Sequence, residues 1–282
     1  MNYFLVGKKK RRYSCPSAWA ELTGEQLAEV AEVLHSGAVK GEALTRIFFS
    51  LVRMRKECRL RLWWLWSISL EDKYDLMRLA KWVLEEPYKQ TVNRLPTVLH
   101  GGVVLHGPLA GCQGFSFIEF IEADMAYLAF RTASDDAARH WELNRLFGIL
   151  YRKRNKDVSK DGKEYPENWN GDMRCAYNTN LVEHNTLAVL EVDDKYKYAA
   201  VMFFAACHTA WEEAFPLIFK KPEAGETSNG GNWSGALKAL AGGSINIDRM
   251  MAVNAVAALS DLNDRIEESE RSKDSRASTG SA

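Results

Sequence analysis

The sequence predicts an all-α, mainly helical protein that folds as a single multi-helix body with at most one short β-hairpin, near residues 97–106. Two observations predict this class. Apolar residues recur at three- and four-residue spacing along most of the chain, as they do on the buried face of a helix. Helix-capping residues precede several of these segments, whereas a single stretch combines the β-branched residues and glycines that are typical of a hairpin.

The first helix has a well-defined start. Thr23 and Gln26 form the capping box T-x-x-Q, in which each side chain accepts a hydrogen bond from the backbone amide of the other residue. We expect this helix to run to about residue 35, because Gly37 then allows the chain to leave the helical conformation. A second helix is expected over residues 42–55.

The segment CRLRLWWLWSIS, residues 58–69, fits two structures. Arginine alternates with leucine in its first half, which fits a strand, but the tryptophan cluster that follows fits a buried helix equally well. We predict a helix here. Ser69 is then expected to cap a further helix, which ends near residue 86 because Pro87 follows.

The strongest strand signal is PTVLHGGVVLHGP, residues 96–108. Two β-branched runs flank Gly101 and Gly102, and a pair of glycines readily adopts the backbone angles of a tight hairpin turn. Helices are expected to resume after this hairpin, at residues 116–131, 135–151, 181–190, 194–215, 233–241 and from 248 onward.

Composition divides the chain into five segments. Residues 1–18 are predicted to be a basic, partly mobile N-terminal segment, and residues 19–222 a helical core domain. Residues 223–232 are rich in Gly, Ser, Asn and Thr, which is typical of a flexible linker. Residues 233–266 are expected to be C-terminal helices that pack on the core. Residues 267–282 lose hydrophobicity and are predicted to be a disordered tail.

The charge balance and the cysteines exclude several classes of protein. Lys plus Arg and Asp plus Glu both number 37, so no overall field steers the chain toward nucleic acid or acidic partners. The five cysteines are scattered without a CxxC pair, no secretory signal is apparent, and every apolar run is too short to span a bilayer. These features indicate a reducing cytoplasm. Neither GxxxxGK[ST] nor GxGxxG occurs, so we predict no cofactor.

The titratable residues do not form a recognisable catalytic or metal site. His100 and His106 could face each other across the hairpin, but no carboxylate or cysteine stands near them at ligand spacing. Cys207 lies in an apolar run and is interpreted as a small buried residue. Its neighbour His208 points elsewhere on the helix, which is poor geometry for a nucleophile and its base. We therefore predict no metal site and no enzymatic activity; an enzyme of unfamiliar class that uses His100, His106 or Cys207 is a further alternative, which a bound metal would favour.

Three acidic residues share one predicted helix. Glu119, Glu122 and Asp124 could act as acid–base groups, since paired carboxylates serve that purpose in many enzymes. The commoner use of such a cluster is a solvated face or a contact with a partner. We predict a solvated or partner-binding face.

Two basic clusters leave open a second class of function. The first is KKKRR near the N-terminus, and the second opens the polar loop at residues 152–179. Their residues are Lys8, Lys9, Lys10, Arg11, Arg12, Arg152, Lys153 and Arg154. Such clusters can follow a nucleic-acid backbone. Acidic residues closely follow the second cluster and would cancel much of its field, so a nucleic-acid-associated or regulatory role is the alternative function.

Five segments taken in order resemble tail-assembly proteins encoded by phages and prophages of Bacteroidetes-type bacteria. They are PSAWAELTGEQL, CQGFSFIEFIEAD, LNRLFGILYRKR, FFAACHTAWEEAF, and NWSGALKALAGG followed by IDRMMAVNAVAALSDL. The positions that carry the likeness are Trp19, Glu21, Leu22, Thr23, Phe117, Phe120, Ile121, Ala123, Asp124, Leu150, Tyr151, Arg152, Leu240, Ala241 and Gly242. The likeness covers most of residues 13–265. Lys153 replaces a proline that is common after the Leu-Tyr-Arg element.

The resemblance implies a non-enzymatic, phage-encoded assembly protein in the cytoplasm of a bacterial host. One such role is a chaperone that holds the long tape-measure protein before the tail tube polymerises. A chaperone needs exposed apolar surface and no catalytic centre. We expect that surface at Tyr165, Trp169 and Trp233, three aromatic residues beside flexible segments. The alternative for each is that it folds back as a lid over the helices.

Overall fold

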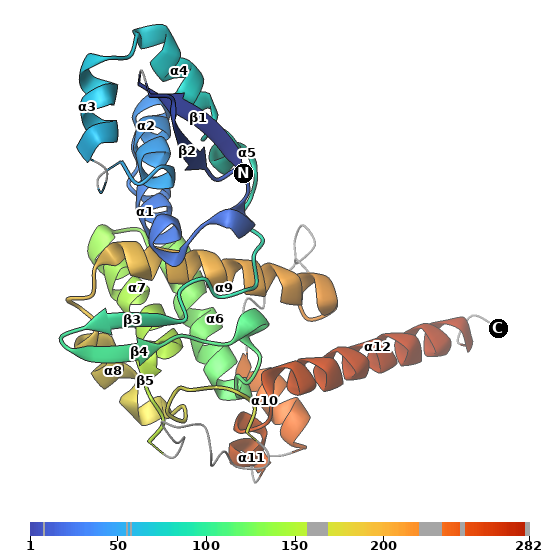
Figure 1. Ribbon diagram of the computed structural model, residues 1–282. Helices are drawn as coiled ribbons and strands as arrows, with labels where there is room; N and C mark the ends of the chain where they lie inside the picture. Colours follow the sequence, from blue (N-terminus) through green and yellow to red (C-terminus); the bar gives the residue numbers. More distant parts are fainter. Residues whose placement is uncertain are drawn as a thin grey trace.

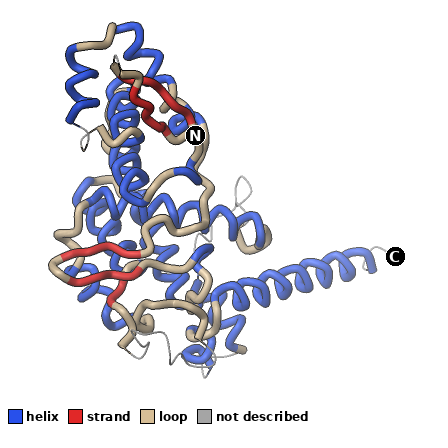
Figure 2. Tube along the Cα trace, viewed as in Figure 1, coloured by secondary structure: helices blue, strands red, loops and turns tan. Residues whose placement is uncertain are grey.

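The computed structural model describes residues 1–7, 9–54, 56, 58–156, 169–219, 233–242 and 246–279, and most of these residues are helical. The predicted mainly helical class is confirmed. In the described part of the chain, strands form one two-stranded sheet and one three-stranded sheet. Figure 2 shows these sheets in red, in different parts of a largely helical trace.

The N-terminal part of the chain contains a β-hairpin and five helices (Figure 1). Of residues 58–69, which fit either a strand or a helix in sequence, residues 58–66 form a helix as predicted. The elements are β1 (Asn2–Val6), β2 (Arg11–Cys15), the 3-10 turn η1 (Trp19–Glu21), α1 (Gly24–His35), α2 (Lys40–Leu51), α3 (Cys58–Trp66), α4 (Leu70–Arg78) and α5 (Trp82–Glu85).

The β1–β2 hairpin corrects the sequence analysis, which predicts only the hairpin at residues 97–106. The two strands pair antiparallel along their whole length, within the segment 1–18 that is predicted to be partly mobile. Phe4 is buried while Tyr3 and Leu5 are exposed, so β1 has the two-residue period of a strand with one covered face. The apolar run before the basic cluster is too short for that period to stand out in the sequence.

The capping predictions are confirmed. Thr23 Oγ1 accepts from the amide of Gln26 at 3.3 Å, and Gln26 Oε1 accepts from the amide of Thr23 at 3.0 Å. Ser69 caps α4, with its Oγ accepting from the amide of Asp72 at 3.1 Å. The helix predicted over residues 69–86 is divided into α4 and α5, because amides just after α4 bond carbonyls three residues back, as in a tighter 3-10 turn.

The central part of the chain packs around α9, the longest helix of this part, which runs between the N-terminal helices and the rest of the molecule (Figure 1). Helix α1 packs against α9, and α6 packs against α7. The elements are β3 (Thr97–His100), β4 (Val103–His106), η2 (Ala110–Cys112), α6 (Phe117–Thr132), α7 (Asp136–Leu150), β5 (Arg152–Lys153), η3 (Thr179–Leu181), α8 (Val182–Ala188) and α9 (Asp194–Ala214).

The predicted hairpin is confirmed as β3 and β4. Gly101 and Gly102 form its turn with φ angles of +54° and +77°, which glycine adopts at little steric cost. The start of the predicted polar loop is β5, which adds a third strand beside β4. His100 lies at the turn and His106 at the far end of the hairpin, so the two histidines do not face each other.

The C-terminal part consists of α10 (Trp233–Ala241), α11 (Ile247–Met251) and α12 (Ala255–Thr279). The sequence predicts one helix from residue 248 onward, but the structure interrupts it. The amide of Phe117 donates to Val253 O at 2.7 Å, and the amide of Ala255 donates to Phe115 O at 2.9 Å. Backbone pairing with the start of α6 therefore replaces helical hydrogen bonds between α11 and α12.

Helix α12 also occupies most of the segment predicted to be a disordered tail, residues 267–282. It continues to Thr279 and projects from the body (Figure 1). Arg265 and Arg271 each pair with a carboxylate four residues earlier, an arrangement that stabilises a solvated helix. The predicted linker at residues 223–232 lies outside the described residues.

The core is rich in aromatic side chains from α2, α6, α7 and α9. Phe204 and Trp211 of α9 are buried on one face, as their seven-residue spacing indicates. Phe215, which the same spacing places on that face, is only partly buried because α9 ends at Ala214. The largest fully buried aromatic residues are Phe48, Phe115, Phe117, Phe120, Phe147, Tyr151, Phe203 and Phe204.

Candidate functional site

Trp233, one of the three aromatic residues predicted to bind a partner, is buried. Its indole Nε1 donates to Asp124 Oδ2 at 2.9 Å, and its ring packs edge-on against Phe120 with centroids 5.0 Å apart. A buried ring offers no apolar surface to a partner, so Trp233 has the folded-back arrangement that is the alternative for these three residues. These contacts instead hold α10 on the core.

The acidic residues of α6 are also placed differently from the prediction. Glu119 and Asp124, predicted to form a solvated or partner-binding face, are both buried. Asp124 Oδ1 lies 2.8 Å from His208 Nε2, and His208 Nδ1 lies 3.5 Å from Glu212 Oε1. Both ring nitrogens of His208 therefore lie beside carboxylates. This arrangement orients the ring and satisfies a buried carboxylate.

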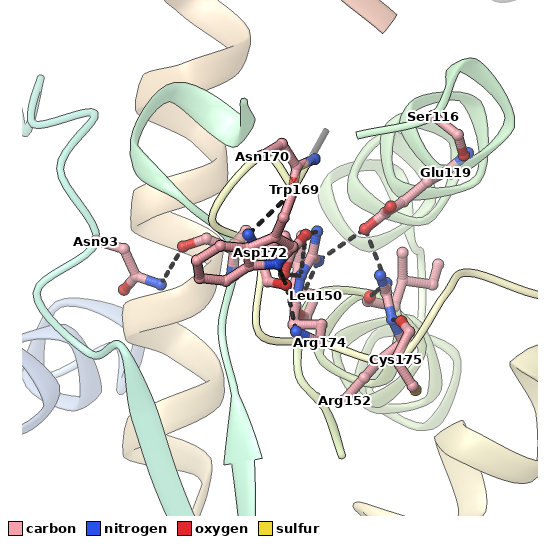
Figure 3. Close-up of polar contacts among 12 residues, drawn as sticks. Asn93, Ser116, Glu119, Leu150, Arg152, Trp169, Asn170, Asp172, Arg174 and Cys175 are labelled. Atoms are coloured by element: carbon pink, nitrogen blue, oxygen red, sulfur yellow. Dashed lines mark hydrogen bonds and ion pairs between the residues drawn. The ribbon is translucent and has the colours of Figure 1, made fainter. Parts of the chain in front are cut away.

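Glu119 is the centre of a second buried cluster, shown in Figure 3. Its Oε1 accepts from Arg152 Nη1 at 2.8 Å and from Arg174 Nη1 at 2.7 Å. Arg174 also forms a two-pronged pair with Asp172. Burial alone would lower the pKa of Arg174, but the charges of Glu119 and Asp172 raise the pKa above its usual value. Each buried charge in this cluster has a partner, which is the usual structural solution for buried ions.

Arg152 is therefore not part of an exposed basic patch. Its side chain is buried and neutralises Glu119 across the junction of α6 and β5. Trp169 lies at the edge of the same cluster, partly buried, with its Nε1 donating to Asp172 O at 3.0 Å (Figure 3). This is the folded-back arrangement that the sequence analysis leaves as the alternative. Tyr165 lies outside the described residues.

The remaining basic residues do not form one surface. The exposed ones in the first cluster are Lys9, Lys10, Arg11 and Arg12, and Lys8 lies outside the described residues. Lys153 is exposed on β5 and Arg154 beside it is partly buried. Figure 1 places the β1–β2 hairpin and β5 in different halves of the molecule. Within the described ranges, no group of three or more His, Cys, Asp or Glu side chains is arranged to hold a metal ion.

The exposed apolar side chains gather instead over β1, α3 and α4. Twenty large hydrophobic residues are exposed in the described part of the chain, and eight of them belong to residues 1–5 and 62–74. Trp66 is the most exposed, at 83%. We call these eight residues the N-terminal apolar surface: Met1, Tyr3, Leu5, Leu62, Leu65, Trp66, Leu70 and Tyr74. Large apolar residues exposed on neighbouring elements of a soluble protein commonly mark an interaction site.

A groove of about 460 Å³ lies between β1 and the helices α3 and α4, next to this surface. Most of its lining is apolar or aromatic. The two charged residues in the lining, Asp72 and Asp75, are both acidic and exposed. The complete lining is Tyr3, Phe4, Leu5, Trp63, Ser67, Ile68, Asp72, Asp75, Leu76 and Leu79. We refer to it as the β1 groove.

Comparison with protein-family models, with curated proteins and with solved structures gives no significant match to this chain. In the part of the chain that the structure describes, no helix is both long enough and apolar enough to cross a membrane.

None of the site residues predicted from sequence lies in the β1 groove. The segment CRLRLWWLW nevertheless indicates an exposed apolar surface, because in a helix its leucine and tryptophan side chains point in every direction. A helix that packs on one layer of a protein buries one face, so such a sequence leaves large apolar residues in solvent. Helix α3 buries Leu60 and Trp64 and leaves Leu62, Leu65 and Trp66 exposed.

Proposed function

We propose that this chain is a non-enzymatic assembly protein that binds another protein through the N-terminal apolar surface. One observation carries the proposal: exposed large apolar residues concentrate on three neighbouring elements that border a groove. Exposing such side chains costs solvation free energy, and burial against a partner recovers it at about 25 cal/mol per Å² of apolar area. Trp66, the most exposed residue of this set, is the strongest candidate for an anchor residue, because tryptophan dominates many protein interfaces.

The resemblance to phage tail-assembly proteins supplies the context. We propose that the protein acts in the cytoplasm of a bacterial host and that its partner is a tail component, with the tape-measure protein as the first choice. A long helical protein exposes apolar segments until it is assembled. A smaller protein with its own exposed apolar surface can cover those segments and prevent aggregation.

The nucleic-acid alternative has weaker support. The two basic clusters lie in separate halves of the molecule, and Arg152 is used internally to neutralise Glu119. The charged residues that line the β1 groove are acidic, which opposes contact with phosphates. Nucleic-acid binding would be recognised by a steep loss of affinity with added salt.

Co-expression with the tape-measure protein of the same phage tests the proposal. The tagged chain is compared with Trp66→Ser, and Trp141→Ser is the matched control because Trp141 is 40% exposed on α7, away from the apolar surface. We expect wild type and Trp141→Ser to capture the partner and to keep it soluble, and Trp66→Ser to lose capture while retaining the helical circular-dichroism spectrum. Equal capture by both variants would place the binding surface elsewhere, and no capture by wild type would count against this partner.

A further inference from the structure

We infer that the β1 groove accepts an extended segment of the partner protein as an additional β-strand, and that this segment alternates apolar with basic residues. The inference rests on the proposed function, because it names how and by which kind of segment the N-terminal apolar surface is engaged. Strand addition supplies affinity through backbone hydrogen bonds, while pockets for alternate side chains supply specificity.

The first step is that β1 has a free edge. It belongs to a two-stranded sheet and pairs with β2 along one side. A strand without a second neighbour presents unpaired amide and carbonyl groups that can template another strand. In the described residues β1 pairs with no strand other than β2, so its second edge has no strand neighbour.

The lining of the groove indicates that it lies along this edge. Tyr3, Phe4 and Leu5 are consecutive residues of β1, and all three border the same cavity. Successive side chains of a strand point to opposite faces of the sheet. Phe4 accordingly is buried while its two neighbours are exposed. Three consecutive residues can border one cavity together where that cavity runs beside the strand, along its backbone.

The opposite wall determines which side chains an added strand should carry. Trp63 comes from α3, and Leu76 and Leu79 come from α4, so these positions form an apolar part of a wall that also carries Asp72 and Asp75. A strand added beside β1 would place every second side chain on the side of the sheet that faces this wall. The groove volume of about 460 Å³ lies within the range of about 300–1,000 Å³ that is usual for ligand pockets. Apolar residues at alternate positions therefore fit the groove.

Charge determines the other positions. Asp75 is exposed at the groove and pairs with Arg78 of the same helix at 3.7 Å, between Oδ1 and Nη1. Asp72, which also lines the groove, accepts a hydrogen bond from Ser69 Oγ. No basic residue is among the side chains that the structure places in the lining. A segment with lysine or arginine between its apolar residues would complement this acidic rim.

The test uses a fluorescein-labelled ten-residue peptide of alternating valine and lysine, with binding followed by fluorescence anisotropy. A second peptide carries glutamate in place of lysine. Two further peptides carry N-methyl groups on the amides of the valines or of the lysines, because alternate amides of a strand point to opposite edges. We expect the glutamate peptide to bind at least about tenfold more weakly, and one of the two methylated peptides to lose about tenfold while the other does not. Equal affinity of both methylated peptides and the parent would overturn strand addition.

Protein variants locate the site. Asp75→Lys should weaken binding of the valine–lysine peptide by about tenfold. Asp136→Lys is its matched control, because Asp136 is also exposed and also paired with an arginine three residues later. Leu5→Lys should weaken binding as well, whereas Leu99→Lys should not, since Leu99 is an exposed strand residue on β3 outside the groove. If each groove variant and its control weaken peptide binding equally, the assignment of the binding site to the β1 groove is overturned.

The outcomes separate this inference from the proposed function. Trp66-dependent capture of the partner without peptide binding would overturn strand addition and leave the proposed function standing. Peptide binding with the expected pattern but no capture of the tape-measure protein would support strand addition and reject that partner. A dimer of wild type in light scattering that Leu5→Lys dissociates would assign the groove to a second copy of the chain, and would overturn the inference.

Discussion

Asp124 on α6 accepts a 2.9 Å hydrogen bond from the indole of Trp233 on α10, although 109 positions separate the two residues in the sequence. The same carboxylate lies 2.8 Å from His208 on α9. Three elements from distant parts of the chain therefore meet at one buried carboxylate. This contact attaches the first C-terminal helix to the core.

Replacing the indole donor should destabilise the protein even if the ring volume is largely kept. Trp233→Phe removes the bond to Asp124 Oδ2 and leaves that buried oxygen without this donor, which typically costs about 1–3 kcal/mol of unfolding free energy. Urea denaturation measures the change. Trp66→Phe is the control because Trp66 is exposed, and an equal shift of both variants would contradict the role of the hydrogen bond.

Trp211 should contribute more, through packing. It is 6% exposed, and its ring meets Phe120 edge-on with centroids 5.0 Å apart. Trp211→Ala would remove a buried aromatic side chain, which typically costs about 3–5 kcal/mol. Thermal and urea unfolding should show a large loss for this variant. The control is Trp141→Ala, at a half-exposed position on α7, which should shift the unfolding midpoint little. Similar shifts for Trp211→Ala and Trp141→Ala would show that this face of α9 is not part of the core.

The charge of Glu119 should be required for stability. Glu119→Gln keeps the size of the side chain but leaves the buried guanidinium groups of Arg152 and Arg174 without the carboxylate that joins them. Breaking a buried ion pair on one side typically costs about 3–5 kcal/mol. Asp261→Asn breaks an exposed pair with Arg265 and should cost well under that. Equal unfolding free energies of the two variants would contradict the prediction.

The ion pair between α1 and α9 should make stability depend on pH. Lys195 Nζ donates to Glu25 Oε1 at 2.9 Å. Burial alone raises the pKa of Glu25, but the hydrogen bond and charge of Lys195 outweigh it and lower the pKa below its usual value. Between the folded and the unfolded pKa, Glu25 therefore binds more protons in the unfolded chain than in the folded chain. The stabilisation is present above the pKa of the unfolded chain, about 4.3, and is lost as the pH falls through the folded value.

Glu25→Gln tests this dependence. The variant should be less stable than wild type at pH 7, and the difference should shrink as the pH falls toward 3. We expect a difference of at most about 1 kcal/mol, because the pair is partly exposed and solvent screens it. Glu183→Gln, an exposed glutamate in the first turn of α8, should show a smaller change. A constant difference between wild type and Glu25→Gln at all pH values would contradict the assignment.

Local signals predicted much of the secondary structure. The Thr23–Gln26 capping box, the Ser69 cap and the turn at Gly101 and Gly102 each depend on residues within four positions of one another. The sequence pattern does not predict the β1–β2 hairpin, because each of its strands is only five residues long. The burial of Phe4 depends on its packing against Phe48 of α2 and Trp63 of α3, which are distant in the sequence. The candidate site was missed for a similar reason, since exposure is a property of the folded surface.

The sequence by itself determined the helical class, most helix starts and the β3–β4 hairpin, because capping, spacing and turn conformation act over a few neighbouring residues. The tertiary structure alone decided which polar residues are inside. Glu119 and Asp124 look like a solvated acidic face, yet their partners Arg174 and His208 lie 55 and 84 positions away. It likewise decided that Trp233 is covered and Trp66 is not. A side chain's burial depends on whether a distant segment arrives to cover it, and no short pattern in the sequence contains that segment.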